Sequence, residues 1–304
     1  MVGPGIRLGG VESMTAVKHA DLSEANQRNR RRQGFLLALP AYAYLLIFFV
    51  FPLGIVVVYS FATRNRFGGT DLEGWNLDSY ARLGEPVLRG ILLRSLTLAV
   101  ITTVICLLVA YPFSYYLATR RPTVRNLLLV FVMIPFWSNF LVRNYTWRVL
   151  LGSDGPISQL TQAIGLGETR ILFTPTAIVL GLVYGFLPFM ILPLYASIER
   201  MDWSLLEASR DLGATGFQTL RSVTIPLTMP GVIAGSILVF IPSFGAFVTP
   251  EILGGGREVL LGSFIVSQFL EARNWPVGAA TSTVLMAVML AAALVYFRRG
   301  GRTL

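Results

Sequence analysis

From Ser204 to Pro226 the chain reads SLLEASRDLGATGFQTLRSVTIP, a polar, glycine-containing segment between two long apolar stretches. A chain that crosses a membrane has little physical reason to keep a long polar loop between two apolar spans. Such a loop is exposed to water and is a natural place to contact a soluble protein. The segment therefore predicts both a membrane-embedded fold and a contact site for a soluble partner.

The segment is predicted to form two short helices with a joint between them. Ser204-Leu-Leu-Glu207 has capping-box spacing, in which the Ser hydroxyl accepts a free backbone N–H and the Glu side chain reaches back to the cap. Gly213 stands where a helix C-terminus favours a left-handed residue without a Cβ atom. Thr215-Gly-Phe-Gln218 repeats the capping box and begins a second helix, which Pro226 is expected to interrupt. Capping and termination alone would account for Glu207 and Gly213, but not for the position of the segment between two spans.

The rest of the chain has the composition of a membrane protein. Hydrophobic residues make up 54% of it and charged residues 13%, and the mean hydropathy is +0.64. A helix needs about 20 apolar residues to cross the hydrocarbon. The stretches without charged residues are Gln33–Thr63, Ser95–Thr119, Asn126–Val142, Ile171–Ile198, Ser222–Pro250 and Asn274–Phe297. We therefore predict an all-α membrane protein with six transmembrane helices.

Two apolar stretches are shorter than a membrane span. Asn126–Val142 reaches across the hydrocarbon only if Arg143 extends its charged end to the interface. Val259–Leu270 is too short to cross and is expected to form a re-entrant or surface helix before the last span. Residues 1–33 are polar and basic, so we expect a disordered cytoplasmic tail before a six-span domain over residues 34–300.

The arginines favour a cytoplasmic N-terminus. The cluster Arg28–Arg32 precedes the first span, and the turn Arg120–Arg125 separates the second and third spans. Positive charge in short loops is retained on the inner side of the membrane. The predicted outer side also carries ten arginines, so the bias is modest. With six spans the C-terminus and the loop 199–221 are cytoplasmic as well, and we attribute the net charge of +9 to membrane topology rather than to nucleic-acid binding.

Several classes of activity lack the residues that they need. Cys106 is the only cysteine, which excludes an intrachain disulfide, and no group of His, Cys and carboxylate residues has metal-ligand spacing. No glycine-rich loop with a lysine of the Walker type is present, so ATP cannot be held by that route. We therefore expect a chain that is not an enzyme, has no cofactor of its own and depends on an energy source in another subunit.

The polar segment resembles the cytoplasmic EAA loop of ABC importer permeases. The family pattern is Glu-Ala-Ala, three residues, Gly, nine residues and Ile-x-Leu-Pro. Here Glu207-Ala-Ser209 is followed after three residues by Gly213, and after nine more by Val223-x-Ile225-Pro226. The spacing matches throughout, while Ser209, Val223 and Ile225 differ from the pattern but keep size or polarity.

This resemblance implies that the loop 199–221, called the coupling loop below, contains the coupling helix that inserts into a cleft on the ATPase subunit. It assigns the first three positions of the motif and its glycine to docking. We expect Arg210 and Asp211, which lie between Ser209 and Gly213, to make polar contacts at the rim of the cleft. The coupling residues so assigned are Glu207, Ala208, Ser209, Arg210, Asp211 and Gly213.

Two further passages resemble the spermidine/putrescine-type branch of these permeases. They are Pro135–Trp147, and Pro250–Gly256 together with Asn274–Ala279. The resemblance covers residues 35 to 298 and implies a type I importer in a bacterial inner membrane. Such an importer has two six-span permeases, of which this chain resembles the first. It also has two ATP-binding cassette subunits, which hold ATP and Mg²⁺, and an extracytoplasmic solute-binding protein.

The outer halves of spans three to five contain prolines grouped with small, aromatic and polar residues. Such breaks in a helix are tolerated where neighbours or a water-filled cavity satisfy the freed backbone groups. This grouping predicts a translocation pathway lined by Phe136, Trp137, Asn139, Tyr145, Tyr184, Phe244, Phe247 and Glu251. The aromatic residues fit an interfacial belt equally well, and Glu251 fits a solvated end of its span.

The sequence is compatible with more than one class of solute. A polyamine favours carboxylates and aromatic faces, where each cation–π contact contributes roughly 0.5–2 kcal/mol. Arg143 and Arg148 near the outer end of span three would repel a cation unless they are paired, with Glu251 as one available partner. An amino-acid derivative, an opine or an organophosphonate is the alternative within the importer class. An ion-coupled secondary transporter is a more remote one, because the six charge-free stretches hold no Asp or Glu.

Overall fold

The computed structural model describes residues 38–65, 69–164 and 171–300. The chain divides into two units, residues 1–58 and 59–304. The described part of the first unit belongs to one apolar helix, Ala38–Ser60, with a mean hydropathy of 2.5. This helix contains the π-turn η1 (Leu46–Val50) and continues as α2 (Phe51–Ser60). The predicted tail, residues 1–33, lies outside the described residues.

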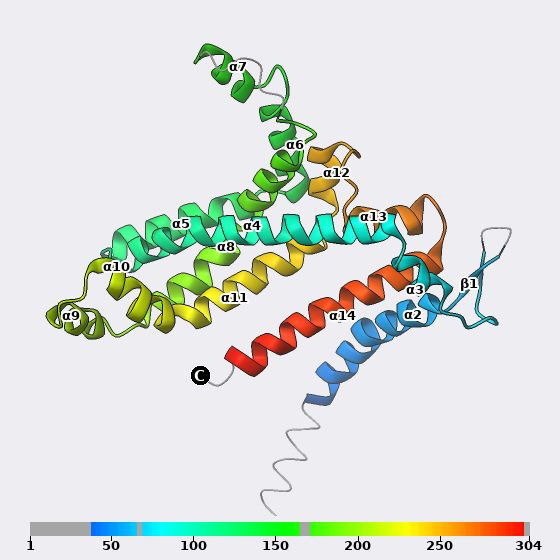
Figure 1. Ribbon diagram of the computed structural model, residues 1–304, viewed down its shortest axis with the longest axis horizontal. Coiled ribbons are helices and arrows are strands. Elements are labelled where there is room, and N and C mark those ends of the chain that lie inside the picture. Colours follow the sequence, from blue (N-terminus) through cyan, green and yellow to red (C-terminus); the bar gives the residue numbers. More distant parts are fainter. Residues whose placement is uncertain (1–37, 66–68, 165–170, 301–304) are drawn as a thin grey trace, which may run out of the picture. The chain divides into compact units, whose positions relative to one another are not determined.

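The second unit is helical apart from one short hairpin. Strands β1 (Thr63–Arg64) and β2 (Thr70–Asp71) are antiparallel, and Thr63 pairs with Asp71. The helices before the coupling loop are α3 (Asp78–Leu83), α4 (Pro86–Ala118), α5 (Pro122–Trp137), α6 (Phe140–Leu150), α7 (Pro156–Ala163) and α8 (Pro175–Glu199) (Figure 1). Those from the coupling loop onward are α9 (Ser204–Asp211), α10 (Gly216–Thr219), the π-turn η2 (Leu220–Thr224), α11 (Ile225–Phe244), α12 (Val248–Gly254), α13 (Leu261–Leu270) and α14 (Trp275–Gly300).

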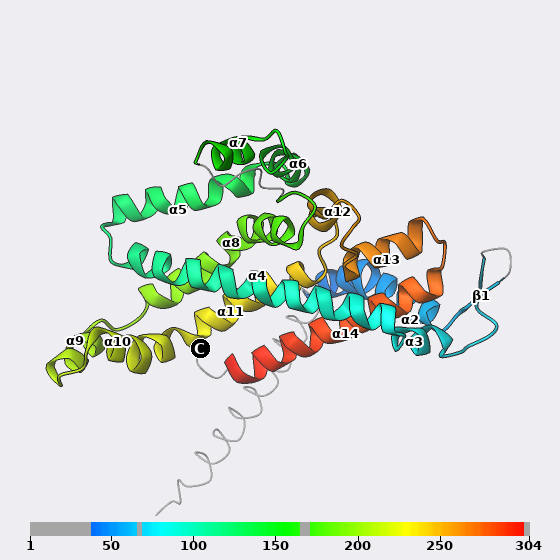
Figure 2. The same cartoon turned by 45° about the horizontal axis from the view of Figure 1, so that its top comes forward.

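The core of the second unit is built by α4, α8 and α11, which pack against one another. With 33 residues, α4 is about 50 Å long at 1.5 Å per residue. Buried side chains of α4, α8 and α11, among them Leu117, Leu194 and Val239, form one continuous apolar cluster. The helices α9 and α10 lie at one end of this group, and the hairpin and α3 lie at the other (Figures 1 and 2).

The lengths and hydropathies of the helices support the predicted transmembrane spans. Among the described residues, five helices are long and apolar enough to cross a membrane. They are Ala38–Ser60, Pro86–Ala118, Pro175–Glu199, Gly216–Phe244 and Trp275–Leu294. The pair α5 and α6 passes the same test only when its two helices are taken together, which raises the number of spans to six.

The third span differs from its predicted course. We expected Asn126–Val142 to cross as one helix, but α5 ends at Trp137 and α6 continues after a bend of 91°. The break has a local cause, because Oδ1 of Asn139 accepts from the N–H groups of Leu141 (2.8 Å) and Val142 (3.3 Å). This N-cap satisfies the first donors of a new helix, so α6 can start in a different direction.

The fifth span also ends earlier than its charge-free stretch. The stretch runs to Pro250, but α11 ends at Phe244 and a separate helix, α12, begins at Val248. The chain passes Gly262 very closely here, since a Cβ atom on that residue would lie 2.5 Å from the carbonyl oxygen of Gly245. Hydropathy does not report this break between α11 and α12, because the residues on both sides of it are apolar.

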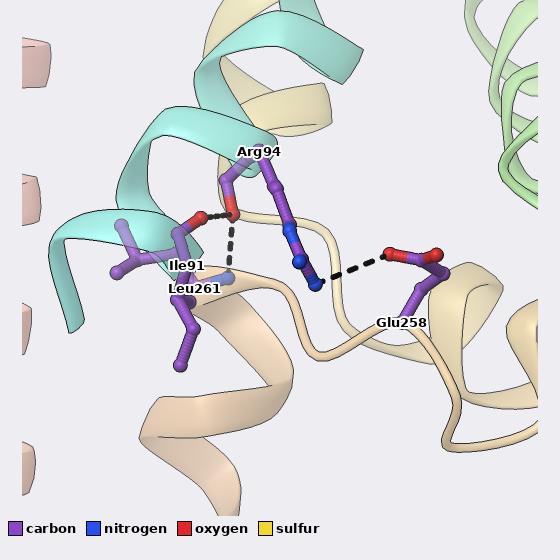
Figure 3. Close-up of polar contacts among 5 residues, drawn as sticks. Ile91, Arg94, Glu258 and Leu261 are labelled. Atoms are coloured by element: carbon purple, nitrogen blue, oxygen red, sulfur yellow. Dashed lines mark hydrogen bonds and ion pairs between the residues drawn. The ribbon is translucent and has the colours of Figure 1, made fainter. Parts of the chain in front are cut away.

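The short helix predicted within Val259–Leu270 is present as α13, and a side chain of α4 caps it. The N–H of Leu261 donates to Oγ of Ser95 at 2.7 Å, and that hydroxyl donates to the carbonyl oxygen of Ile91 at 2.9 Å (Figure 3). The first N–H groups of a helix have no partner within it, so Ser95 supplies one from a distant segment. An ion pair between Arg94 and Glu258, 3.9 Å apart, spans the same junction.

Candidate functional site

The coupling loop folds into the two predicted helices, α9 and α10, with Gly213 in the joint. Gly213 has a φ of +85°, and its N–H donates to the carbonyl oxygen of Arg210 at 2.9 Å. The next N–H, of Ala214, donates to the carbonyl oxygen of Ser209 at 3.1 Å and so helps to close the end of α9. A Cβ atom on Gly213 would meet nothing within 4 Å. The backbone conformation alone therefore favours glycine here.

One predicted capping box is confirmed and the other is wrong. At the start of α10, the N–H of Gln218 donates to Oγ1 of Thr215 at 3.4 Å, and Oε1 of Gln218 accepts from the N–H of Thr215 at 2.8 Å. At the start of α9 the Ser204 hydroxyl makes no cap. Instead, Oδ1 of Asp202 accepts from the N–H of Ser204 at 3.0 Å. The Asp202 carboxylate thus takes the N–H that the Glu207 side chain was expected to satisfy.

We expect Asp202→Ala to loosen α9 more than Ser204→Ala does, because the carboxylate accepts the N–H at the start of the helix and the hydroxyl does not. Hydrogen bonds from the Ser204 hydroxyl and from the Ser204 N–H lower the pKa of Asp202. The stabilisation from this carboxylate is thus complete above the ordinary Asp pKa, and it is lost as the pH falls through the lowered value. Amide hydrogen exchange of peptides covering residues 202–212 at neutral pH measures the difference. Faster exchange in the Ser204→Ala protein than in the Asp202→Ala protein would contradict the assignment of the cap.

The surface of the coupling loop is less polar than its sequence indicates. Glu207, Ala208, Arg210 and Asp211 are exposed, as expected for contact residues, whereas Ser209 is half-buried. Large apolar side chains lie beside them, and we did not predict these as contacts: Leu205 is 45% exposed, Leu212 89% and Phe217 72%. Exposed apolar side chains gathered on one loop mark a protein contact surface. Alternation of polar and apolar residues through the loop was the available signal in the sequence.

Pro226 does not interrupt the helix that follows the joint. Residues Gly216–Phe244 form one continuous helix, in which η2 replaces an α-helical turn. Within η2 the N–H of Ile225 donates to the carbonyl oxygen of Leu220, five residues earlier. A proline has no N–H and collides with the carbonyl group four residues before it in an α-helix. The wider π-turn accommodates Pro226 without ending the helix.

The predicted pathway residues are distributed between exposed and buried positions. Trp137 is the most exposed aromatic residue among them at 78%, and Phe136, Tyr145, Tyr184, Phe247 and Glu251 are also exposed. Phe136 and Tyr184 each make an edge contact, with Phe189 (5.2 Å between centroids) and Trp147 (5.4 Å) respectively. Asn139 caps α6, as described above. Phe244 is only 2% exposed and packs against Ala99 and Leu261, so it contributes to the core of this chain.

The arginines of α6 are not paired with Glu251. Nη1 of Arg143 donates to the carbonyl oxygen of Pro135 at 2.9 Å, across the bend between α5 and α6. The guanidinium of Arg148 lies 5.8 Å from the ring centroid of Phe173. Over the described ranges, Glu251 has no ion-pair partner within 4.0 Å. The pairing considered from the sequence is therefore absent, and the Glu251 carboxylate is exposed at the surface of α12.

Comparison with known proteins identifies the same family as the coupling loop does. Residues 110–299 match the family described as the binding-protein-dependent transport system inner membrane component. The spermidine/putrescine transport system permease protein PotB of Escherichia coli K12 is 44% identical over 257 residues, which cover 84% of this chain and 93% of the relative. PotB of Haemophilus influenzae is 42% identical over 277 residues, covering 89% and 94%.

Solved structures of low sequence identity share the fold. A bacterial ABC transporter involved in the import of the acidic polysaccharide alginate superimposes with a TM-score of 0.72 at 16% identity, covering 93% of this chain and 99% of that one. The alginate transporter in complex with a pentasaccharide-bound periplasmic protein gives a TM-score of 0.68 at 15% identity, with coverages of 91% and 96%. At this identity the likeness concerns the fold alone.

The family match spans more than half of the chain, and the PotB relatives match most of it. Permeases of this class reside in the inner membrane and work with a binding protein and with an ATPase carried by separate subunits. The chain therefore belongs to the family of binding-protein-dependent transport system inner membrane components, and it is the permease subunit of an ABC importer.

Proposed function

We propose that this permease moves a polyamine of the spermidine/putrescine class inward by alternating access. The observation that carries the proposal is the 42–44% identity to PotB proteins over 84–89% of the chain. In the proposed assembly, this chain pairs with a second, homologous permease. Two ATP-binding cassette subunits bind ATP and Mg²⁺, and a solute-binding protein delivers the polyamine from outside. No cofactor is assigned to this chain itself.

The chemistry of the outer helices supports a cationic solute. Glu251 on α12 is exposed and unpaired within the described part of the chain, and Phe247 on the turn before it is 46% exposed. Trp137 and Tyr145 add exposed aromatic faces on α5 and α6. Since α12 packs against both α6 and α8, the carboxylate of Glu251 and the ring of Tyr145 belong to neighbouring helices. We infer that they contribute to the pathway, while Phe244 is left out because of its burial.

The coupling loop is proposed to dock into the ATPase subunit and to transmit its movement. The residues in this role are Glu207, Ala208, Ser209, Arg210, Asp211 and Gly213, joined by the exposed Leu212 and Phe217. The charged residues of α9 would contact the rim of the cleft, and the apolar pair would be buried within the interface. Burial of large apolar side chains at such a contact contributes more than exposed ion pairs do.

The test is reconstitution of this permease with its partner subunits in proteoliposomes. We expect spermidine or putrescine, together with the binding protein, to stimulate ATP hydrolysis and to be taken up, while a panel of zwitterionic amines has no effect. Stimulation by a zwitterionic amine, an opine or a phosphonate alone would overturn the polyamine proposal and leave the importer class intact.

A charge-neutral variant tests the proposed lining in the same vesicles. We expect Glu251→Gln to reduce polyamine uptake several-fold, because a carboxylate that faces a polycation is replaced by an uncharged amide of the same shape. Glu271→Gln, which neutralises an exposed glutamate just after α13, is the matched control and should leave uptake unchanged. Equal uptake by the two variants would remove Glu251 from the pathway.

A further inference from the structure

A line of hydroxyl groups connects the coupling helix α9 with span α4. Oγ of Ser209 lies 3.1 Å from Oγ1 of Thr219. Oγ1 of Thr224 donates to the carbonyl oxygen of Thr219 at 3.4 Å, and Oγ1 of Thr228 donates to the carbonyl oxygen of Thr224 at 2.8 Å. The line ends on α4, where Oη of Tyr111 lies 3.1 Å from Oγ1 of Thr228. Four elements, α9, α10 with η2, α11 and α4, are thus joined by consecutive polar contacts.

The π-turn η2 aligns the three threonines of this line. Thr219 and Thr224 are five residues apart, and Thr224 and Thr228 are four apart. Residues five apart share a face only where the turn is widened to the π form, whereas residues four apart share a face in an α-helix. The spacing therefore follows the change from η2 to α11. Rewinding η2 as an α-helix would rotate Thr219, and the coupling loop before it, away from the line.

The hydrogen-bond donors in the line can be assigned from its geometry. The Thr228 hydroxyl has one proton, which it directs to the carbonyl oxygens of Thr224 (2.8 Å) and Ile225 (3.3 Å). The Tyr111 hydroxyl must therefore be the donor to Oγ1 of Thr228. Thr219, Thr224 and Thr228 are 3%, 2% and 0% exposed. The Thr228 hydroxyl is fully buried, so it has no bulk water to replace the Tyr111 contact if that contact is lost. The end of the line is therefore sensitive to the relative position of α11 and α4.

A cavity of about 340 Å³ lies beside the line. Leu206 and Arg210 of α9 line one side of it, and Tyr111, Pro112 and Tyr115 of α4 line the other. Close packing is thus interrupted between these parts of the two helices, and the hydroxyl line passes along the edge of the gap. A ring contact between Tyr115 and Trp203, with centroids 5.7 Å apart, flanks the same region. Movement of α9 toward or away from α4 has room here, and the hydroxyl line would have to follow it.

We propose that this hydroxyl line transmits movement of the coupling helix to span α4, with Thr219, Thr224, Thr228 and Tyr111 as positioning residues for coupling. The inference rests on the proposed docking role of the coupling loop. Ser209 occupies a position where the family pattern has alanine, and its hydroxyl supplies the first contact of the line. Serine at this position is therefore a functional difference from the pattern rather than a neutral exchange.

The experiment compares Thr228→Val and Tyr111→Phe with two matched controls in the reconstituted importer. Thr281→Val removes a hydroxyl that is equally buried and bonded to its own helix at 2.8 Å, and Tyr80→Phe removes a hydroxyl bonded to Ser60 at 2.7 Å. Loss of one buried hydrogen bond changes an equilibrium by roughly five- to tenfold. We expect the spermidine transported per ATP to fall by about that factor in both test variants, with stimulated ATP hydrolysis retained.

The double variant Thr228→Val/Tyr111→Phe should transport as much spermidine per ATP as either single variant, because each single substitution already removes the contact between the two hydroxyls. Unchanged transport per ATP in the two test variants would overturn the proposal. So would an equal loss in the Thr281→Val and Tyr80→Phe controls, since that result would indicate general destabilisation.

A measurement without solute separates this proposal from the proposed function. Amide hydrogen exchange is compared between the nucleotide-free and ATP-bound complexes of the permease and its ATPase subunits. In the wild type we expect ATP to alter exchange both at residues 204–215 and at residues 108–116. In Thr228→Val the change at 204–215 should remain, and the change at 108–116 should disappear. Persistence of both changes in Thr228→Val would overturn the proposal that the hydroxyl line transmits movement to α4. Absence of any change at 204–215 in the wild type would instead refute the docking role of the loop.

Discussion

Replacing Gly213 by valine is expected to reduce ATP-driven uptake to background while the permease stays in the membrane. The φ of +85° at this residue lies in the left-handed region, which costs an L-residue roughly 1–2 kcal/mol and a β-branched one more. Valine would force the joint between α9 and α10 into another conformation and so turn α9 away from its docking position. Uptake by proteoliposomes, and recovery of the ATPase subunits with the purified permease, measure the effect.

Two matched variants separate backbone strain from steric bulk at the joint. Gly213→Asn should keep most of the uptake, because asparagine tolerates the left-handed conformation and no residue other than the two chain neighbours lies within 4 Å of the added Cβ. Gly216→Ala, at a glycine of the same loop with open space and ordinary φ, should behave like the wild type. Normal uptake by Gly213→Val would end the coupling assignment. Loss of uptake in Gly213→Asn would replace the strain argument with a clash against the partner.

The predictable parts of this fold are those that local chemistry determines. Charge-free stretches located the long spans, because the cost of a charged group in hydrocarbon leaves a visible mark on the sequence. The left-handed Gly213 and the cap at Thr215 were predictable for a similar reason, since each depends on neighbours within a few residues. The start of α9 shows the limit of this approach. Asp202 and Ser204 both offer an acceptor, and the structure uses the carboxylate.

The features that could not be predicted depend on segments far apart in the sequence. Ser95 caps α13 across 166 positions, and Tyr111 contacts Thr228 across 117. Phe244 carries no sign in the sequence that it is buried in the core rather than exposed to a pathway. The π-turn before Pro226 was not predictable either. Proline predicts that an α-helix cannot continue unchanged, but it does not say whether the helix ends or widens.

A β-branched residue at Gly231 is expected to destabilise the fold strongly, although helix propensity alone predicts a slight stabilisation. Gly231 and Gly235 are four residues apart on α11 and face α8. A Cβ atom on Gly231 would lie 2.5 Å from Cβ of Ser197 and 2.7 Å from the carbonyl oxygen of Pro193. Small residues at this spacing allow two membrane helices to approach closely. Because the carbonyl belongs to the backbone, no change of rotamer relieves the contact, and α8 and α11 would have to separate.

Gly90→Val is the matched control, since Gly90 also lies within a long apolar helix but an added Cβ there meets nothing within 4 Å. Valine is a better helix former than glycine by a few tenths of a kcal/mol, so this variant should be as stable as the wild type or slightly more so. Overpacking typically costs about 1–3 kcal/mol, and the rigid backbone contact places Gly231→Val at the upper end of that range. Thermal unfolding in detergent and the yield of folded protein from membranes measure both variants. A midpoint for Gly231→Val equal to that of Gly90→Val would mean that α8 and α11 are not in close contact in the membrane.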